Sequence, residues 1–105
     1  MQVDAVRKLA MSLPDATEEP HFHFTSFRIK GKIFATMPPS NDLLHVFVPE
    51  EERAVATQSH PDLCEALHWG KRVVGLKVNL AKAKPAFVED LLRAAYASKS
   101  ATAKR

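Results

Sequence analysis

Hydrophobic residues at helical spacing begin the chain. They recur every three or four positions and predict an amphipathic helix over the first dozen residues: Val3, Val6, Ala10 and Leu13. Pro14 and Asp15 end this helix, because proline disfavours the helical conformation in the residue before it. The segment from Asp15 to Thr25 is then expected to be a loop, and it carries the sequence His21-Phe22-His23-Phe24.

From Ser26 the hydrophobic period changes to two, which is typical of β-strands. Two such runs flank Gly31, so we expect a β-hairpin from Ser26 to Met37 that turns at this glycine. A three-residue loop is favoured, because it keeps four apolar side chains on one face: Phe27, Ile29, Ile33 and Ala35. A turn from Met37 to Asp42 follows, since its paired prolines cannot feed a central strand.

A third strand and a second helix come next. Alternation predicts a strand from Leu43 to Val48, with three side chains facing the core: Leu44, Val46 and Val48. Pro49 followed by three glutamates is typical of a helix start, because proline fits the first turn and acids favour the positive end of the helix dipole. This helix is expected to end near Gln58, before His60-Pro61.

The rest of the chain predicts three further elements. We expect a short helical turn from Asp62 to His68, then a strand from Val73 to Leu80 with Lys77 facing outward. A final helix from Pro85 carries one apolar stripe: Phe87, Val88, Leu91, Leu92 and Ala95. The order of elements indicates an α+β fold, in which N- and C-terminal helices pack on an antiparallel sheet in two layers.

Composition indicates one soluble domain. The chain has 105 residues, of which 46% are hydrophobic and 26% charged. We expect a single domain over residues 1–99 and a disordered basic tail over residues 100–105. The one cysteine, Cys64, excludes an internal disulfide and suits a reducing compartment. Because apolar runs are short and the first residues are polar, we expect a cytoplasmic monomer without a membrane partner.

Basic residues are concentrated late in the sequence. The formal net charge is +3, yet residues 1–69 hold 6 Lys/Arg against 10 Asp/Glu, while residues 70–105 hold 9 against 2. A positive field of this kind attracts phosphate groups. We expect six residues to supply phosphate contacts: Arg28, Lys30, Lys32, Lys71, Arg72 and Lys77. The alternative is a charged sheet face that only discourages aggregation.

A second candidate site surrounds His21 and His23. In an extended chain these side chains point the same way, so a metal site with Glu18 or Glu19 is conceivable. A closed site needs three or four ligands, and a third is not assured, so no metal is predicted. We favour hydrogen bonding by the histidines within the loop, with the neighbouring phenylalanines packed under the helices.

Trp69 is the one tryptophan, and it stands next to Gly70. Tryptophan has the chemistry to stack on a nucleobase, but a core position is favoured here. A cleft near His21, His23 and Trp69 is the basis of the alternative function, a protein- or small-ligand-binding module.

Catalytic motifs are missing from the sequence. It contains no Ser-His-Asp motif, Walker loop, dinucleotide fingerprint or HExxH. Cys64 follows His60 by four residues, but a buried structural cysteine is favoured over a nucleophile. Glu50, Glu51 and Glu52 are interpreted as helix-capping acids rather than iron ligands. We therefore predict a non-enzyme without a cofactor.

Nearly the whole chain, roughly from Val3 to Lys99, resembles the MmcQ/YjbR-like family. The most specific part is Glu19-Pro20-His21-Phe22 with Ser26-Phe27-Arg28-Ile29-Lys30-Gly31-Lys32-Ile33-Phe34-Ala35-Thr36. Similar spacing continues through Pro49-Glu50-Glu51, His60-Pro61, Trp69-Gly70, Lys77-Val78-Asn79-Leu80 and Leu91-Leu92-Arg93-Ala94-Ala95-Tyr96. Val73-Val74 departs from the pattern, where the family often has a glycine and an aromatic residue.

The resemblance implies a CyaY-like fold, similar to bacterial frataxin, with helices packed on an antiparallel sheet. It also implies DNA binding through a "double-wing" arrangement of hairpins and helices. Because a fold does not determine a function, the residues that contact DNA have to be argued from the site itself. Our expectation is weak, sequence-nonspecific binding through a basic sheet face.

Overall fold

The computed structural model of the chain describes residues 1–39 and 42–103. These residues form α1 (Val3–Met11), β1 (Ala16–His21), β2 (Phe24–Ile29), β3 (Lys32–Met37), β4 (Leu43–Val46), α2 (Glu50–Ser59), β5 (Cys64–Trp69), β6 (Arg72–Asn79) and α3 (Pro85–Ala103). The strands make one sheet in the order β1-β2-β3-β4-β6-β5, and all neighbouring strands are antiparallel. The expected α+β fold is confirmed.

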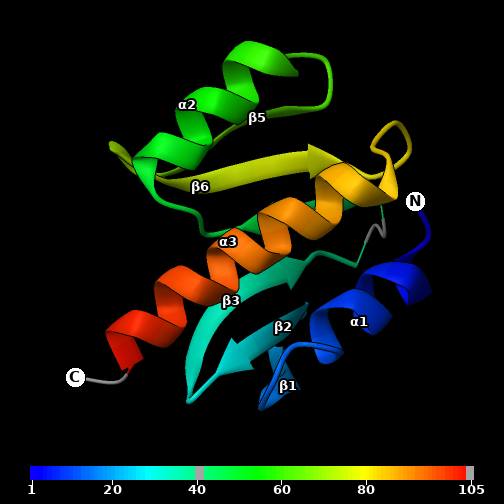
Figure 1. The fold of residues 1–105 in the computed structure, drawn as a ribbon, viewed down its shortest axis with the longest axis vertical. Coiled ribbons are helices and arrows are strands. Elements are labelled where there is room, and N and C mark those ends of the chain that lie inside the picture. Colours follow the sequence, from blue (N-terminus) through cyan, green and yellow to red (C-terminus); the bar gives the residue numbers. More distant parts are fainter. Residues whose placement is uncertain (40–41, 104–105) are drawn as a thin grey trace.

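The helices lie on one face of the sheet. Figure 1 shows α3 running diagonally across β3 with α1 beside it, while α2 packs on β5. The His60 ring, just after α2, lies 4.8 Å from the Phe87 ring of α3, so these two helices share a layer. No helix of the described residues covers the other face, which carries Ser26, Thr36 and Lys77 and which we call the open face. Within the described residues, no helix is long and apolar enough to cross a bilayer.

The core lies between the sheet and the helices. Its largest fully buried side chains include Phe27, Phe34, Ile29, Leu44, Leu76, Leu80 and Leu92. Burial of each such side chain contributes about 1.5–3 kcal/mol relative to exposure. The Tyr96 ring of α3 packs edge-on against Phe34 at 5.7 Å, and its hydroxyl donates a hydrogen bond to the Pro14 carbonyl at 2.6 Å. These contacts fix α3 both to the sheet and to the segment that follows α1.

The segment from Asp15 to Thr25, which we expected to be a loop, is largely a β-hairpin. β1 pairs with β2 from Ala16↔Ile29 to His21↔Phe24, and a two-residue turn joins them. The loop prediction was wrong because β1 is an edge strand with exposed residues after Ala16, so it lacks the alternating apolar pattern that marks a half-buried strand.

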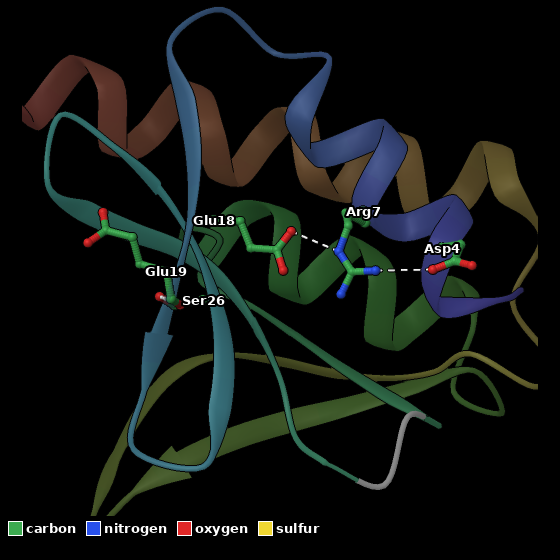
Figure 2. A network of polar contacts seen from close by, with 5 residues as sticks. All are labelled: Asp4, Arg7, Glu18, Glu19 and Ser26. Carbon is green, nitrogen blue, oxygen red and sulfur yellow. Dashed lines mark hydrogen bonds and ion pairs between the residues drawn. The ribbon is translucent and has the colours of Figure 1, made fainter.

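Two adjacent glutamates of β1 project from opposite faces of the sheet, as Figure 2 shows. Glu18 turns toward α1, where its carboxylate lies 2.8 Å from Arg7 Nε. Arg7 also pairs with Asp4 at 3.1 Å, so this small network fastens the edge strand to the helix. Glu19 turns away and lies beside Ser26 on the open face.

The β2–β3 hairpin turns at Gly31 as predicted, but its loop has two residues instead of three. Ile29 pairs with Lys32, while Lys30 and Gly31 have φ values of 51° and 82°. Positive φ at both central residues is what a type I′ turn requires. A bulge opposite Phe27 then adds one residue to β3, so Phe34 enters the core. Our placement of Ile33 on the core face was therefore wrong.

β5 replaces the short helical turn expected from Asp62 to His68. It pairs with β6 from Cys64↔Val78 to Trp69↔Arg72 and forms the other edge of the sheet. The prediction was wrong because a short apolar segment is compatible with either a helix or a strand. The hydrogen bonds to β6 make this segment a strand.

Two of the predicted segments include residues that the structure does not describe. The turn predicted from Met37 to Asp42 includes residues 40 and 41, which lie outside the described residues. α3 continues to Ala103, so the tail boundary placed at residue 100 falls inside the helix, while residues 104 and 105 lie outside the description. The helices predicted at the beginning, the middle and the end of the chain are confirmed.

Gly75 allows two central strands to approach closely. A Cβ at this position of β6 would overlap the Val46 carbonyl oxygen and lie 3.1 Å from Phe47 Cα. Both obstacles are backbone atoms, which cannot rotate away as a side chain does. The β4–β6 pairing at the centre of the sheet therefore requires glycine here.

We expect Gly75→Ala to lower the free energy of unfolding by about 2–3 kcal/mol, because the methyl group forces the two strands apart. Gly31→Ala is the matched control: nothing lies near its Cβ position, and only its φ of 82° opposes alanine. That variant should lose about 1 kcal/mol. Urea denaturation followed by circular dichroism measures both. Equal losses in the two variants would contradict the close approach of the strands.

Candidate functional site

A row of polar side chains crosses the open face of the sheet. Cross-strand pairing aligns one residue from each strand, in the order Glu19, Ser26, Thr36, His45, Lys77 and Glu65. The buried Ser26 hydroxyl donates a hydrogen bond to the Glu19 carbonyl at 2.7 Å. Thr36 Oγ1 lies 3.4 Å from His45 Nδ1, and Lys77 Nζ lies 3.2 Å from Glu65 Oε1. Hydrogen bonds and ion pairs thus fix the centre of this face.

His45 stands in the middle of the row. Its burial, and next the charge of Lys77, lower its pKa below the ordinary histidine value. The imidazole is therefore neutral at physiological pH and offers one hydrogen-bond donor and one acceptor. The Phe24 ring lies 5.9 Å from it, so an aromatic surface adjoins these polar atoms.

A cleft of 730 Å³ opens over this row. Six rings line it: His21, Phe22 and Phe24 from the β1–β2 hairpin, and His45, Phe47 and Trp69 from β4, its continuation and β5. Arg53, Arg72 and Lys99 also contribute to its lining, and no carboxylate is among the described residues that do so. The cleft is therefore aromatic at its walls and positive at its rim.

Trp69 lies on the surface, and our expectation that it belongs to the core was wrong. It is 63% exposed, because it ends an edge strand and faces the open side opposite Arg72. Its ring packs against Phe47 with the centroids 5.5 Å apart. Phe47 is only 7% exposed, so the Trp69 ring packs against a buried side chain while much of Trp69 remains in solvent.

Phe22 is 90% exposed at the tip of the β1–β2 hairpin. Its φ of 59° places it in the left-handed region, which glycine and asparagine tolerate much better than an aromatic residue. Neither burial nor local backbone preference accounts for phenylalanine here. The expectation that Phe22 and Phe24 pack under the helices was wrong, since Phe24 is half-buried in the cleft on the open face.

The structure separates the six cations predicted to contact phosphate into two groups. Arg28 and Lys77 lie on the open face and have acidic neighbours, Glu19 at 4.0 Å and Glu65 at 3.2 Å. The other four are exposed at two hairpin tips and have no acidic partner among the described residues: Lys30, Lys32, Lys71 and Arg72.

His21 and His23 do not act as a pair. His21 ends β1 and lines the cleft, whereas His23 lies in the turn and does not contribute to the lining. The geometric premise of a shared extended strand was therefore wrong. Glu18 is engaged with Arg7 on the helix side, and no cluster of three or more metal-ligating side chains occurs within the described residues.

Cys64 is 6% exposed and belongs to the core, as predicted. Its burial, and next the charge of Asp62, raise the pKa of the thiol. The thiol donates a hydrogen bond to the His60 carbonyl with 3.6 Å between sulfur and oxygen. It is thus held protonated, the form that is least nucleophilic.

A family model described as YjbR matches residues 11–98 of the chain. The chain belongs to the YjbR family. The resemblance found in the sequence is confirmed, and the match includes both hairpin tips and every strand of this YjbR domain.

A solved structure shares the fold of this YjbR chain. Protein DR2400 of Deinococcus radiodurans, whose crystal structure is described as a DUF419 domain, superposes with a TM-score of 0.77 and 23% sequence identity. The similarity covers 90% of this chain and 76% of that one. At this identity it establishes the fold alone. No curated protein matches the sequence.

Sequence reasoning missed much of the cleft. It did not select Phe22, Phe24, His45 or Phe47 as site residues. A signal for two of them was present, because His45 and Phe47 alternate with the core residues of one strand and so had to face the other side. The hairpin that brings Phe22 and Phe24 to the cleft had no such pattern.

We expect the His45 ring to titrate below the ordinary histidine pKa of about 6.5. Because the unfolded chain then binds more protons, the free energy of unfolding should fall as pH decreases through 6.5 toward the lowered pKa. Lys77→Met should raise the His45 pKa, whereas Lys71→Met in the nearby turn should not. NMR titration of the ring measures this. An unchanged pKa in Lys77→Met would contradict the role of that charge.

Proposed function

We propose that this YjbR domain binds nucleic acid weakly and without sequence preference, and that it acts as a binding protein rather than a catalyst. One observation carries the proposal: four exposed cations, which have no acidic partner among residues 1–39 and 42–103, occupy two hairpin tips at the same end of the sheet. Lysine and arginine contacts to phosphate position a protein on a nucleic acid without reading its sequence.

The sheet topology brings the two tips to one end. β3 starts at its turn with β2, β4 returns antiparallel toward that end, and β6 starts again from it. The turn after Ile29 and the turn after Trp69 therefore lie at the same end, on the left of Figure 1, although they belong to distant parts of the sequence. Residues of both hairpins line the cleft that lies between them.

Arg28 and Lys77 are secondary in this proposal. An incoming phosphate has to compete with Glu19 for Arg28 and with Glu65 for Lys77. The Arg28 side chain is also only 21% exposed and that of Lys77 36% exposed, so both are less accessible to a phosphate. We therefore assign the main phosphate contacts to the four exposed cations that have no acidic partner among the described residues.

A small-ligand site is the second candidate function. The volume of 730 Å³ lies within the range of about 300–1,000 Å³ that is typical of small-molecule pockets. Of the residues first selected for this alternative, His21 and Trp69 line the cleft and His23 does not.

Charge reversal at the two tips tests the main proposal. Lys30→Glu with Arg72→Glu should weaken binding of a fluorescein-labelled 12-nucleotide single strand at least tenfold. It should also flatten the log–log dependence of affinity on salt by about 1.4, at about 0.7 per single-strand phosphate contact. Fluorescence anisotropy across a salt series measures both quantities.

Lys82→Glu with Lys84→Glu is the matched control. It makes the same change in net charge at two exposed lysines next to α3, at the opposite end of the sheet. It should leave the salt dependence nearly unchanged. Equal losses from the two double variants would mean that net charge alone drives binding, and no binding at low salt would refute the proposed function.

Removing the negative charge of Glu50 should strengthen nucleic-acid binding, whereas the charge reversals weaken it. Glu50 begins α2 and shares a surface depression with Arg72, so its carboxylate lowers the positive potential near one tip. Glu50→Gln should tighten binding about twofold at low salt and less at high salt, because screening weakens the repulsion. Glu89→Gln, on α3, is the control. The same anisotropy titrations apply, and weaker binding by Glu50→Gln would contradict phosphate contacts at this tip.

A further inference from the structure

We infer that the cleft selects unpaired nucleobases, so that the nucleic acid bound is single-stranded, with a base stacked on Trp69. This inference rests on the proposed function and names its substrate class. It begins from the pairing of Trp69 with Arg72, which places these two residues directly opposite each other at one hairpin end and in the lining of the same cleft. A ring surface for a base and a cation for its phosphate are thereby provided by neighbouring residues.

Trp69 is held ready to stack. Phe47 supports one part of the indole, while Trp69 as a whole is 63% exposed and contributes to the lining of the cleft. An aromatic surface that is already ordered loses little side-chain freedom when a base stacks on it. Stacking of this kind tolerates any base, because every base has a π-face.

Phe22 provides a second exposed ring across the same cleft. Its hairpin is the far one in the sheet, yet Phe22 and Trp69 both line the one cavity. Positive φ is what a two-residue hairpin turn requires at its first central residue, but glycine and asparagine meet that requirement better than phenylalanine. The Phe22 ring meets the ring of the adjacent His21 at 4.8 Å, and the residue is still 90% exposed, so a stacking role accounts for an aromatic side chain at this turn.

The lining of the cleft suits a base and its phosphate together. The described lining residues include Arg53, Arg72 and Lys99 and no carboxylate, so the charge of the lining is complementary to an anion. Arg53 also donates a hydrogen bond to the Val48 carbonyl at 2.8 Å. Thr36 and His45 also line the cleft and offer hydrogen-bonding atoms to the edge of a base. In a duplex the faces of the bases are covered by their neighbours, so only an unpaired base can present its face to Trp69.

Three labelled probes of closely similar phosphate number test this inference: a 12-nucleotide oligothymidylate, the same backbone with abasic sites throughout, and a 6-base-pair duplex whose strands are joined by a linker so that it stays paired. Trp69 is the one tryptophan of the chain, so quenching of its fluorescence reports directly on stacking. We expect oligothymidylate to quench the emission and to bind at least about fivefold more tightly than the abasic strand, as one stacked base would provide.

Variants separate stacking from folding. Trp69→Ala should weaken oligothymidylate binding about fivefold or more and leave binding of the abasic strand unchanged, while Trp69→Phe should restore most of the affinity. Phe22→Ala should also weaken oligothymidylate binding selectively. Because Phe22 is exposed, its loss should leave the fold intact, and circular dichroism of each variant checks this.

The outcomes distinguish this inference from the proposed function. Equal affinity for oligothymidylate and the abasic strand, or tighter binding of the duplex, would overturn the inference and leave phosphate binding in place. No binding of any probe at low salt would overturn both. Competition by thymidine monophosphate as strong as that by the oligomer would overturn the inference in favour of a small-ligand site.

Discussion

The antiparallel register of the six-stranded sheet decides what each side of this protein can do. In a strand, successive side chains point to opposite faces, so the register that buries Phe27, Leu44 and Leu76 under the helices also sends Ser26, His45 and Lys77 to the other side. Close approach at Gly75 keeps the two central strands in this arrangement. The core and the open face are therefore two consequences of one pairing pattern, and neither can shift without the other.

The cations of the proposed site lie at the ends of strands rather than at their centres. Two-residue turns after Ile29 and Trp69 place cations beyond the sheet, where the polar row no longer supplies carboxylates to neutralise them. At the centre, by contrast, the described cations are paired, and burial together with Lys77 keeps His45 neutral. The result is a neutral, hydrogen-bonded floor with two positive hairpin tips at one end of the sheet. This distribution of charge suits a ligand with a planar uncharged part and an anionic part.

Membership of the YjbR family and the fold shared with DR2400 constrain the architecture, and the chemistry of the cleft has to be argued from this chain. Trp69, Phe22 and Arg72 carry that argument because their positions serve no evident structural need. An exposed indole, a phenylalanine in a left-handed turn and a guanidinium without an ion pair in the described part of the chain each leave the core unaffected. Their gathering at one cavity is what connects the binding proposal to a substrate class.

The sequence by itself determined the three helices, the strands with strong alternation and the α+β class, because hydrophobic period and proline placement are local signals. It also determined that Cys64 is a core residue and which residues carry the positive charge. Tertiary structure alone decided the edge strands β1 and β5, the bulge that buries Phe34 instead of Ile33, and the exposure of Trp69. These features depend on pairing partners that lie far away in the sequence. Most side chains of the edge strand β1 are exposed, so they do not show the alternation of apolar and polar residues that predicts a strand. The cleft belongs to this second group, since its walls come from hairpins that only the sheet brings together.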